Sequence, residues 1–238
     1  MSETVPGSAG VPPEGAAAPP FIYLASRSPR RLELLRQVGV TCRVFVDDDE
    51  ARAEGLEQVR PGEAPGAYVR RVARAKARAA LERVWATGLP PAPLLCADTT
   101  VALGGTLLGK PSDAEDAVRM LRLLSGRTHR VLTAVVVARA DGARLFEAVQ
   151  ISRVRFCRLK PADIAGYVAS GEPFGKAGGY AIQGLAAAFV RRIEGSHSGI
   201  MGLPLHETVR LLRKAGHPVP FLEPAGDDLF GSQLPNPP

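Results

Sequence analysis

Short apolar runs that suit buried strands alternate along the chain with longer stretches in which apolar residues recur at helical spacing. The predicted strands are Phe21–Ala25, Leu94–Ala97, Val131–Arg139, Leu145–Phe156 and Phe189–Ile193, with a hairpin of Val101–Leu103 and Thr106–Leu108 turning at Gly104-Gly105. The predicted helices are Pro29–Val38, Ala67–Trp85, Asp113–Leu124, Pro161–Ala169 and Pro204–Ala215. Because hairpins are mixed with strand–helix units, the pattern predicts an α/β fold with a mixed sheet.

Local signals set the starts of two of these helices. Ser28 is the expected N-cap of the first, with Pro29 at the first helical position and Gly39 after its end. Ser112, with Glu115 three residues later, predicts a capping box at the start of the third.

The 238 residues suit one large α/β domain or two small ones, and no internal repeat or linker is seen between the two ends of the chain. Residues 1–20 are rich in Pro, Gly and Ala and are expected to form a disordered arm, whereas residues 218–238 form a Pro-rich tail. No apolar run is long enough to span a bilayer, and the N-terminus has neither the basic nor the apolar region of a signal peptide. We therefore expect a cytoplasmic protein that does not enter a membrane.

A formal net charge of +6 suits a polyanionic partner, which could be a phosphorylated small molecule or nucleic acid. The basic helix segment Arg70–Arg83 is flanked by Tyr68 and Trp85, and aromatic residues make up only 5% of the chain. Because base-stacking surfaces interleave aromatic with basic residues, nucleic acid is the less favoured partner. The three scattered cysteines are expected to be reduced, and no histidine has zinc-ligand spacing.

The first predicted helix carries Arg30 and Arg31 in its opening turn. Cations are unfavourable at this positive end of the helix dipole, where acidic residues are usual. Together with the free backbone N–H groups, the two arginines would bind a strong anion such as phosphate. The alternative is that both side chains point into water.

Asp98 follows the apolar run Leu94–Ala97, where a carboxylate could serve as a metal ligand or general base, or simply form a turn. Lys76 and Lys110 are unremarkable singly. The segment Gly104–Lys110, GGTLLGK, matches the start of a phosphate-binding P-loop, but Pro111 stands where that motif needs Ser or Thr. We therefore reject the P-loop in favour of a hairpin turn.

The segment Lys176–Gly184, KAGGYAIQG, has three glycines that would let its backbone approach a ligand closely. The Gln183 amide offers donors and an acceptor suited to the edge of a base. An ordinary flexible turn would explain the same composition.

Seven segments, in order and with matching spacing, make the chain resemble the Maf family of nucleotide pyrophosphatases. They are LASRSPRRLELL (Leu24–Leu35), YVRRVARAKA (Tyr68–Ala77), ADTTV (Ala97–Val101), GKP (Gly109–Pro111), MLRLLSGRTHRVLTAV (Met120–Val135), SGEPFGKAGGYAIQG (Ser170–Gly184) and GLPLHET (Gly202–Thr208).

The resemblance implies an elongated, twisted mixed sheet flanked by helices, with two lobes around a cleft, in one domain over residues 21–217 that usually forms a homodimer. It also implies hydrolysis of a nucleoside triphosphate to the monophosphate and pyrophosphate, dependent on Mg²⁺ or Mn²⁺. The form of the KAGGYAIQG segment is similar to that of the branch acting on dTTP and UTP.

The resemblance also implies a role for each candidate residue. Arg30, Arg31, Lys76 and Lys110 would neutralise the triphosphate and the leaving group. Asp98 would hold the metal and orient or deprotonate the attacking water. The substrate contacts would be completed by Ser26 and Ser28 at the phosphates, Gln183 at the pyrimidine edge and, as a weaker candidate, Lys176.

The chain departs from the family pattern at a few positions. The second acidic metal site falls in VDDDEA, where Glu50 or Asp49 is the equivalent residue. His197, Gly175 and Arg27 also differ from residues common in relatives. Two other functions stay open: a pyrophosphatase that removes modified nucleotides, and a non-enzymatic regulator of septum formation or nucleic-acid binder.

Overall fold

The computed structural model describes residues 20–46 and 55–222. The predicted N-terminal arm lies outside these residues except for Pro20, and the predicted tail lies outside them from residue 223 onward. In the described ranges, none of the helices combines the length and the apolar character needed to cross a membrane.

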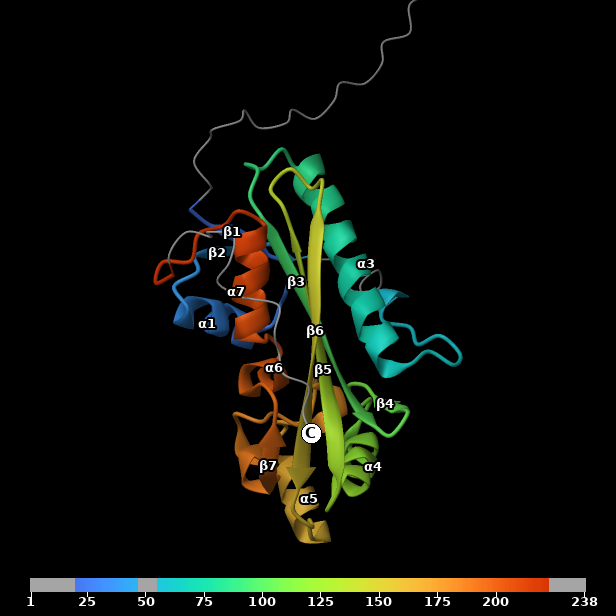
Figure 1. Ribbon diagram of the computed structural model, residues 1–238. Helices are drawn as coiled ribbons and strands as arrows, with labels where there is room; N and C mark the ends of the chain where they lie inside the picture. Colours follow the sequence, from blue (N-terminus) through green and yellow to red (C-terminus); the bar gives the residue numbers. More distant parts are fainter. Residues whose placement is uncertain (1–19, 47–54, 223–238) are drawn as a thin grey trace, which may run out of the picture.

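A seven-stranded mixed sheet lies at the centre of the fold, which confirms the predicted α/β class with a mixed sheet (Figure 1). Its strand order is β2-β1-β3-β5-β6-β7, with β4 paired to β3. β1 is parallel to β2 and β3, and the other pairs are antiparallel. The strands are β1 (Ile22–Leu24), β2 (Cys42–Val44), β3 (Leu94–Leu103), β4 (Thr106–Leu108), β5 (Thr128–Ala138), β6 (Leu145–Phe156) and β7 (Val190–Glu194).

Helices cover this sheet in two lobes that the long strands β3, β5 and β6 join (Figure 1). In the upper lobe α3 packs on one face of the sheet, and α1 and α7 pack on the opposite face. In the lower lobe α4 and α5 pack against the far ends of the same strands. The helices are α1 (Pro29–Gln37), α3 (Pro65–Ala86), α4 (Ala114–Leu124), α5 (Pro161–Ala169), α6 (His197–Met201) and α7 (Leu205–Lys214), with short 3-10 turns at Ala177–Gly179 and Leu185–Phe189.

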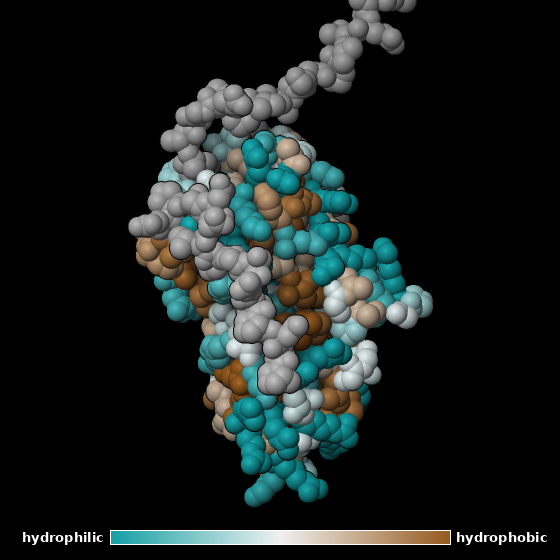
Figure 2. Space-filling view, viewed as in Figure 1, coloured by the Kyte–Doolittle hydropathy of each residue, from teal (hydrophilic) through white to brown (hydrophobic). Residues whose placement is uncertain are grey.

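The surface of the two lobes is uneven in character. Figure 2 shows hydrophilic residues gathered at the lower end of the molecule and brown, hydrophobic residues nearer its middle. Arg153 and Arg155 on β6 and Arg192 on β7 are among the exposed residues of the lower lobe. The formal positive charge of the chain is therefore carried in part by this solvated end.

The strand that carries Asp98 is longer than predicted. Instead of a short strand ending before Asp98, β3 runs without a break from Leu94 to Leu103, so the prediction of Asp98 at a strand end was wrong. Side chains alternate between the two faces of a strand, which puts Asp98 on the face that packs against α3. The hydrophobic pattern breaks at Asp98 because a polar partner meets it there, and not because the strand stops.

Two helix starts also differ from expectation in detail. Ser28 is the N-cap residue of α1, as predicted, but its side chain makes no capping hydrogen bond. The N-cap of α4 is Asp113 instead of Ser112, because the Asp113 carboxylate accepts the backbone N–H of Asp116 at 2.8 Å. Ser112 donates its hydroxyl to that carboxylate at 3.0 Å.

The turn between β3 and β4 confirms the rejection of the P-loop. Leu103 pairs with Thr106 in an antiparallel hairpin, and Gly104 at its tip has a φ of 60°, which favours glycine. β2, with three residues, and α6, with five, were not predicted.

A buried polar pair lies inside the apolar core of the lower lobe. His129 Nε2 and the Tyr180 hydroxyl are 2.8 Å apart, and both rings make edge contacts with Phe156. His129 is only 1% exposed, and burial lowers its pKa to about 4. The imidazole is therefore neutral in the folded protein at pH 7.

This pair predicts a specific loss of stability in mild acid. The unfolded chain binds a proton at His129 near pH 6.5, whereas the folded chain binds it only near pH 4, so the stabilisation is complete above about pH 6.5 and is lost as the pH falls toward 4. The unfolding free energy of the wild type should fall when the pH is lowered from 7 to 5. In His129→Gln, whose amide does not titrate, we expect this fall to be smaller by about 2 kcal/mol. Urea unfolding at the two pH values measures this. The exposed His197→Gln is the control, and an equal pH dependence in His129→Gln and wild type would contradict the assignment.

Candidate active site

A cleft of about 700 Å³ opens between α1, α3, β3 and the glycine-rich segment after α5. This volume lies in the range of ordinary small-molecule sites. The cleft brings together residues predicted from well-separated parts of the sequence. The predicted residues that line it are Ser26, Ser28, Arg30, Arg31, Lys76, Asp98, Lys110 and Lys176.

One predicted residue is not brought into the cleft by this structure, and another lies outside the described residues. Gln183 is exposed and is not among the described residues that line the cleft. Glu50, like the alternative Asp49, lies outside the described residues. Their proposed roles therefore stay predictions.

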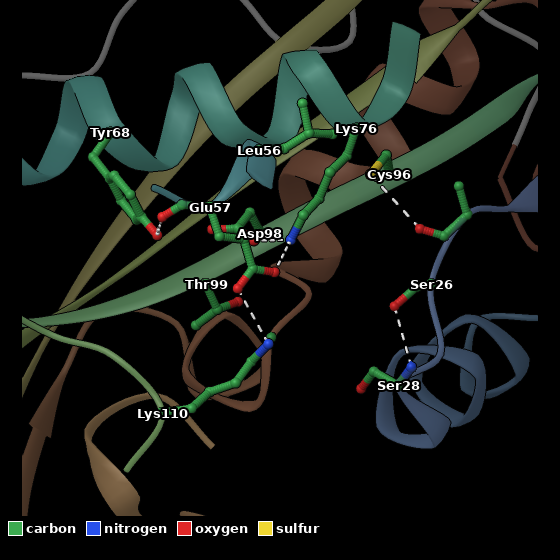
Figure 3. A network of polar contacts seen from close by, with 12 residues as sticks. Ser26, Ser28, Leu56, Glu57, Tyr68, Lys76, Cys96, Asp98, Thr99 and Lys110 are labelled. Atoms are coloured by element: carbon green, nitrogen blue, oxygen red, sulfur yellow. Dashed lines mark hydrogen bonds and ion pairs between the residues drawn. The ribbon is translucent and has the colours of Figure 1, made fainter. Parts of the chain in front are cut away.

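The start of α1 forms one wall of the cleft. No acidic residue lies in its first turn, and the backbone N–H of Ser28 donates to Ser26 Oγ at 3.2 Å (Figure 3). Arg30 Nε donates to the Met201 carbonyl at 3.3 Å. Both arginines are half-buried, so the alternative of side chains pointing freely into water is wrong. A helix start with two arginines and no carboxylate is suited to an anion.

Arg31 connects this helix to the sheet and to α6. Its guanidinium donates to the Gly202 carbonyl at 2.8 Å, to Ser26 Oγ at 3.0 Å and to Thr99 Oγ1 at 3.2 Å. Gly202 has a φ of 115°, a conformation that L side chains rarely adopt. Burial lowers the pKa of Arg31, and the charge of nearby Asp98 opposes the shift. The fork geometry of the guanidinium thus fixes where its remaining donors can point.

The opposite wall carries a row of alternating charges (Figure 3). Lys76 Nζ, from α3, donates to Asp98 Oδ1 at 2.7 Å and to Glu57 Oε1 at 2.5 Å. Lys110 Nζ, after β4, donates to Glu57 Oε2 at 3.2 Å. Asp98 is 8% exposed, so its carboxylate is a nearly buried charge that meets a cation.

Electrostatics in this row favour the charged forms of Lys76 and Glu57. Burial lowers the pKa of Lys76, but the carboxylates of Asp98 and Glu57 outweigh it and raise the pKa above its usual value. Burial raises the pKa of Glu57, but Lys76 and Lys110 outweigh it and lower the pKa. The site therefore holds ionised groups at neutral pH.

The glycine-rich segment closes the cleft because its backbone can lie against β3 and the end of β4. Gly178 has a φ of 70°, and a Cβ there would come within 2.8 Å of Val101 Cγ2. The Gly178 N–H donates to the Gly109 carbonyl at 2.9 Å, which fixes the segment beside Lys110. An ordinary flexible turn is therefore not the explanation for these glycines.

Lys176 belongs to the same segment and lines the cleft near Arg30. Its Nζ donates to the carbonyls of Glu172 at 2.5 Å and Phe174 at 3.3 Å. Burial, followed by the charge of Arg30, lowers the pKa of Lys176. Lys176 and Arg30 therefore repel each other at this edge of the cleft, and both would attract a bound anion.

Sequence reasoning missed Glu57 and Thr99. Thr99 adjoins Asp98 in the ADTTV segment and could have been found from that neighbour; its Oγ1 also lies 3.0 Å from Thr133 Oγ1. Glu57 gave no signal, because its contacts with Lys76 and Lys110 join residues 19 and 53 positions apart.

The donor chemistry of the cleft fits a hard divalent cation bound together with a phosphorylated ligand. Mg²⁺ commonly uses one or two carboxylates and completes its shell with phosphate oxygens and water. Asp98 supplies such a carboxylate at the cleft. No cluster of three or more His, Cys, Asp or Glu occurs in residues 20–46 and 55–222, so the described part of the chain has no metal cage independent of substrate.

Comparison with known proteins gives a consistent result over most of the chain. Residues 21–215 match the family model described as Maf-like protein. A dTTP/UTP pyrophosphatase of Ralstonia nicotianae is 60% identical over 203 residues, covering 85% of this chain and 98% of the relative. One of Cupriavidus metallidurans is 60% identical over 196 residues, covering 82% and 97%. One of Burkholderia pseudomallei is 57% identical over 205 residues, covering 86% and 98%.

The Arg31 contacts predict that lysine cannot replace this arginine. Arg31→Lys keeps the charge but cannot reach Ser26, Thr99 and the Gly202 carbonyl with one planar fork. We expect the unfolding free energy to fall by about 1–3 kcal/mol, because polar partners are left unpaired. Urea unfolding measures the change, with Arg36→Lys on the exposed side of α1 as the control. Equal stability of the two variants would show that the fork is dispensable.

Proposed function

The chain belongs to the Maf family, and on that premise we propose that it hydrolyses nucleoside triphosphates, dTTP and UTP foremost, to the monophosphate and pyrophosphate. The observation that carries the proposal is the cleft in which Asp98 faces Lys76 while Arg30, Arg31, Lys110 and Lys176 line the walls. The names of the relatives support the substrate, since three of them, 57–60% identical, are called dTTP/UTP pyrophosphatases. They give no support to modified nucleotides or to a non-enzymatic regulator.

In the proposed function, the cations of the cleft bind the triphosphate. The backbone N–H groups at the start of α1 and the side chains of Ser26 and Ser28 would contact phosphate oxygens, and Arg30 would add its charge. Lys110 on the opposite wall would meet the far end of the triphosphate. Cations placed where charge develops on the pyrophosphate leaving group stabilise the transition state more than the ground state.

Asp98 is the proposed base. A water oxygen would attack the α-phosphorus, the bond to the bridging oxygen would break, and the proton of the water would pass to Asp98 as pyrophosphate leaves. Lys76 holds the carboxylate in one orientation by its 2.7 Å contact with Oδ1. A bound Mg²⁺ or Mn²⁺, held by Asp98 and Glu50, would supply charge neutralisation and a more acidic water.

The experiment that tests the function is a substrate panel with a matched pair of variants. Purified protein is incubated with nucleoside triphosphates and Mg²⁺ or Mn²⁺, and pyrophosphate and monophosphate are quantified. We expect dTTP and UTP to lead, chelation of the metal to abolish turnover, and Asp98→Asn to lower kcat at least about 100-fold. Asp141→Asn, in the turn before β6, is the control for loss of one carboxylate. Absence of turnover by folded wild-type protein would reject the enzymatic function.

Gln183 remains the proposed reader of the base. Because its side chain is exposed, it must turn toward the nucleotide when substrate binds. We expect Gln183→Ala to raise KM for dTTP and UTP about tenfold, the value of a lost hydrogen bond in a site that excludes water, with a much smaller effect on binding of inorganic tripolyphosphate. Steady-state kinetics and calorimetry measure the two effects, and equal losses for both ligands would assign Gln183 to the phosphates or to the fold instead.

We also propose that the protein acts in the cytoplasm as a homodimer. The three cysteines are free thiols, which suits a reducing compartment. The dimer follows from the family resemblance, and light scattering coupled to size-exclusion chromatography would test it against a monomer of 25.2 kDa.

A further inference from the structure

The carboxylate of Glu172 holds the far end of the glycine-rich segment. Its Oε2 accepts the backbone N–H of Leu185 at 2.9 Å, and its Oε1 accepts that of Ala186 at 3.3 Å. The Tyr167 hydroxyl, on α5, donates to the same Oε1 at 2.9 Å. Hydrogen bonds to an ionised acceptor are stronger than those between neutral groups. One carboxylate thus fastens the start of the 3-10 turn Leu185–Phe189 to α5.

This carboxylate, and not the backbone, explains the glycine at position 184. Gly184 has a φ of −105°, an extended conformation that other residues also adopt. A Cβ at Gly184 would overlap Oε2 of Glu172. The residue after Gln183 therefore lacks a side chain because the Glu172 carboxylate fills the space that the side chain would need.

The pair of Tyr167 and Glu172 is attached to the chain on both sides of Gln183. The Tyr167 hydroxyl accepts the backbone N–H of Ala181 at 3.3 Å, two residues before Gln183, and Glu172 accepts that of Leu185, two residues after it. Tyr167 is only 4% exposed, so its ring is fixed in the core of the lower lobe. The Gln183 side chain is exposed, and its direction is set by the backbone on which it stands.

Glu172 also lies near two cations of the cleft. Burial lowers the pKa of Arg30, and the Glu172 charge opposes that shift. Burial and the charge of Arg30 lower the pKa of Lys176, and Glu172 opposes this shift as well. The donors that contact the Glu172 carboxylate come from the segment and from α5, whereas Arg30 and Lys176 donate to backbone carbonyls. The direct contacts of the carboxylate therefore favour a role in holding the segment over a role at the phosphates.

Resting on the proposed function, we propose that Glu172 is a positioning residue for base recognition: together with Tyr167 it fixes the backbone on both sides of Gln183 and so sets where the Gln183 amide meets the pyrimidine. Glu172 acts through Gln183 and not on the reacting atoms. Its removal should weaken the part of the affinity that depends on the base and spare the part that depends on the phosphates.

The test measures the binding of two ligands by calorimetry in the presence of Mg²⁺. One is the α,β-imido analogue of dUTP, which resists hydrolysis between the α- and β-phosphates, and the other is inorganic tripolyphosphate, which has no base. We expect Glu172→Gln to weaken binding of the analogue about fivefold, because a neutral amide cannot accept all three donors, and binding of tripolyphosphate less than about twofold. Gly184→Ala, which pushes the carboxylate away, should give the same selective loss. Tyr167→Phe should give a smaller one.

Two matched controls remove the same groups outside the cleft. Glu147→Gln removes a carboxylate that makes ion pairs with Arg70 and Arg74, and Tyr23→Phe removes a hydroxyl that donates to the Pro90 carbonyl at 3.0 Å. Both variants should bind the two ligands as the wild type does.

A double variant shows whether Glu172 acts through Gln183. In a protein that already carries Gln183→Ala, adding Glu172→Gln should weaken binding of the dUTP analogue less than about twofold further, because the group that Glu172 positions is gone. A merely structural role would give two independent losses that multiply.

Four results would overturn the inference. Unchanged binding of the analogue by Glu172→Gln would show that the carboxylate is dispensable, and equal weakening of both ligands would assign it to the fold as a whole. Tighter binding of tripolyphosphate would show that its charge acts on the phosphates, and losses that multiply in the double variant would separate it from Gln183. These measurements need no turnover, so wild-type hydrolysis of dTTP, assayed in parallel, distinguishes failure of this inference from failure of the proposed function.

Discussion

The ion pair between Lys76 and Asp98 is the contact on which the rest of the site depends. It joins the middle of α3 to the middle of β3 at a place where neither charge is well solvated. Ala73 and Ala80 lie on the same face of α3 as Lys76, and both are buried, so the helix can approach the strand closely. Breaking one partner of such a pair leaves an uncompensated charge, which commonly costs about 3–5 kcal/mol. The same contact therefore both holds α3 on the sheet and orients the carboxylate of the proposed base.

Most of the fold could be predicted from the sequence because its elements carry their own period. β5, β6, α4 and α5 have strong local patterns, and the structure places them within a few residues of the prediction. The residues of the anion site were predictable where they broke a local rule, as Arg30 and Arg31 do at a helix start. Glu57 could not be found this way, because a single glutamate in a polar segment is ordinary. Only its contacts with Lys76 and Lys110, which the sequence does not show, place it in the site.

Asp98 was picked out by the sequence as a candidate site residue, but its predicted position at a strand end was wrong. A polar residue after an apolar run is typical of a strand end, and the sequence alone gives no sign that a lysine 22 positions earlier will meet it. The strand continues because Cys96, Asp98, Thr100 and Ala102 alternate onto the α3 face, where Lys76 meets the Asp98 carboxylate. Tertiary pairing thus overrode the local signal, while the chemical significance of the carboxylate was unchanged.

A cleft built to bind a polyanion has to exist without one. Arg30, Arg31, Lys76, Lys110 and Lys176 line a single cavity, and in the empty protein their mutual repulsion opposes folding. A carboxylate such as Glu57 relieves that repulsion between Lys76 and Lys110, and does so from a backbone that α3 holds in place. Stability of the free protein and attraction for a polyanion therefore depend on the same cations, as is general for sites whose charges are not fully compensated by the fold.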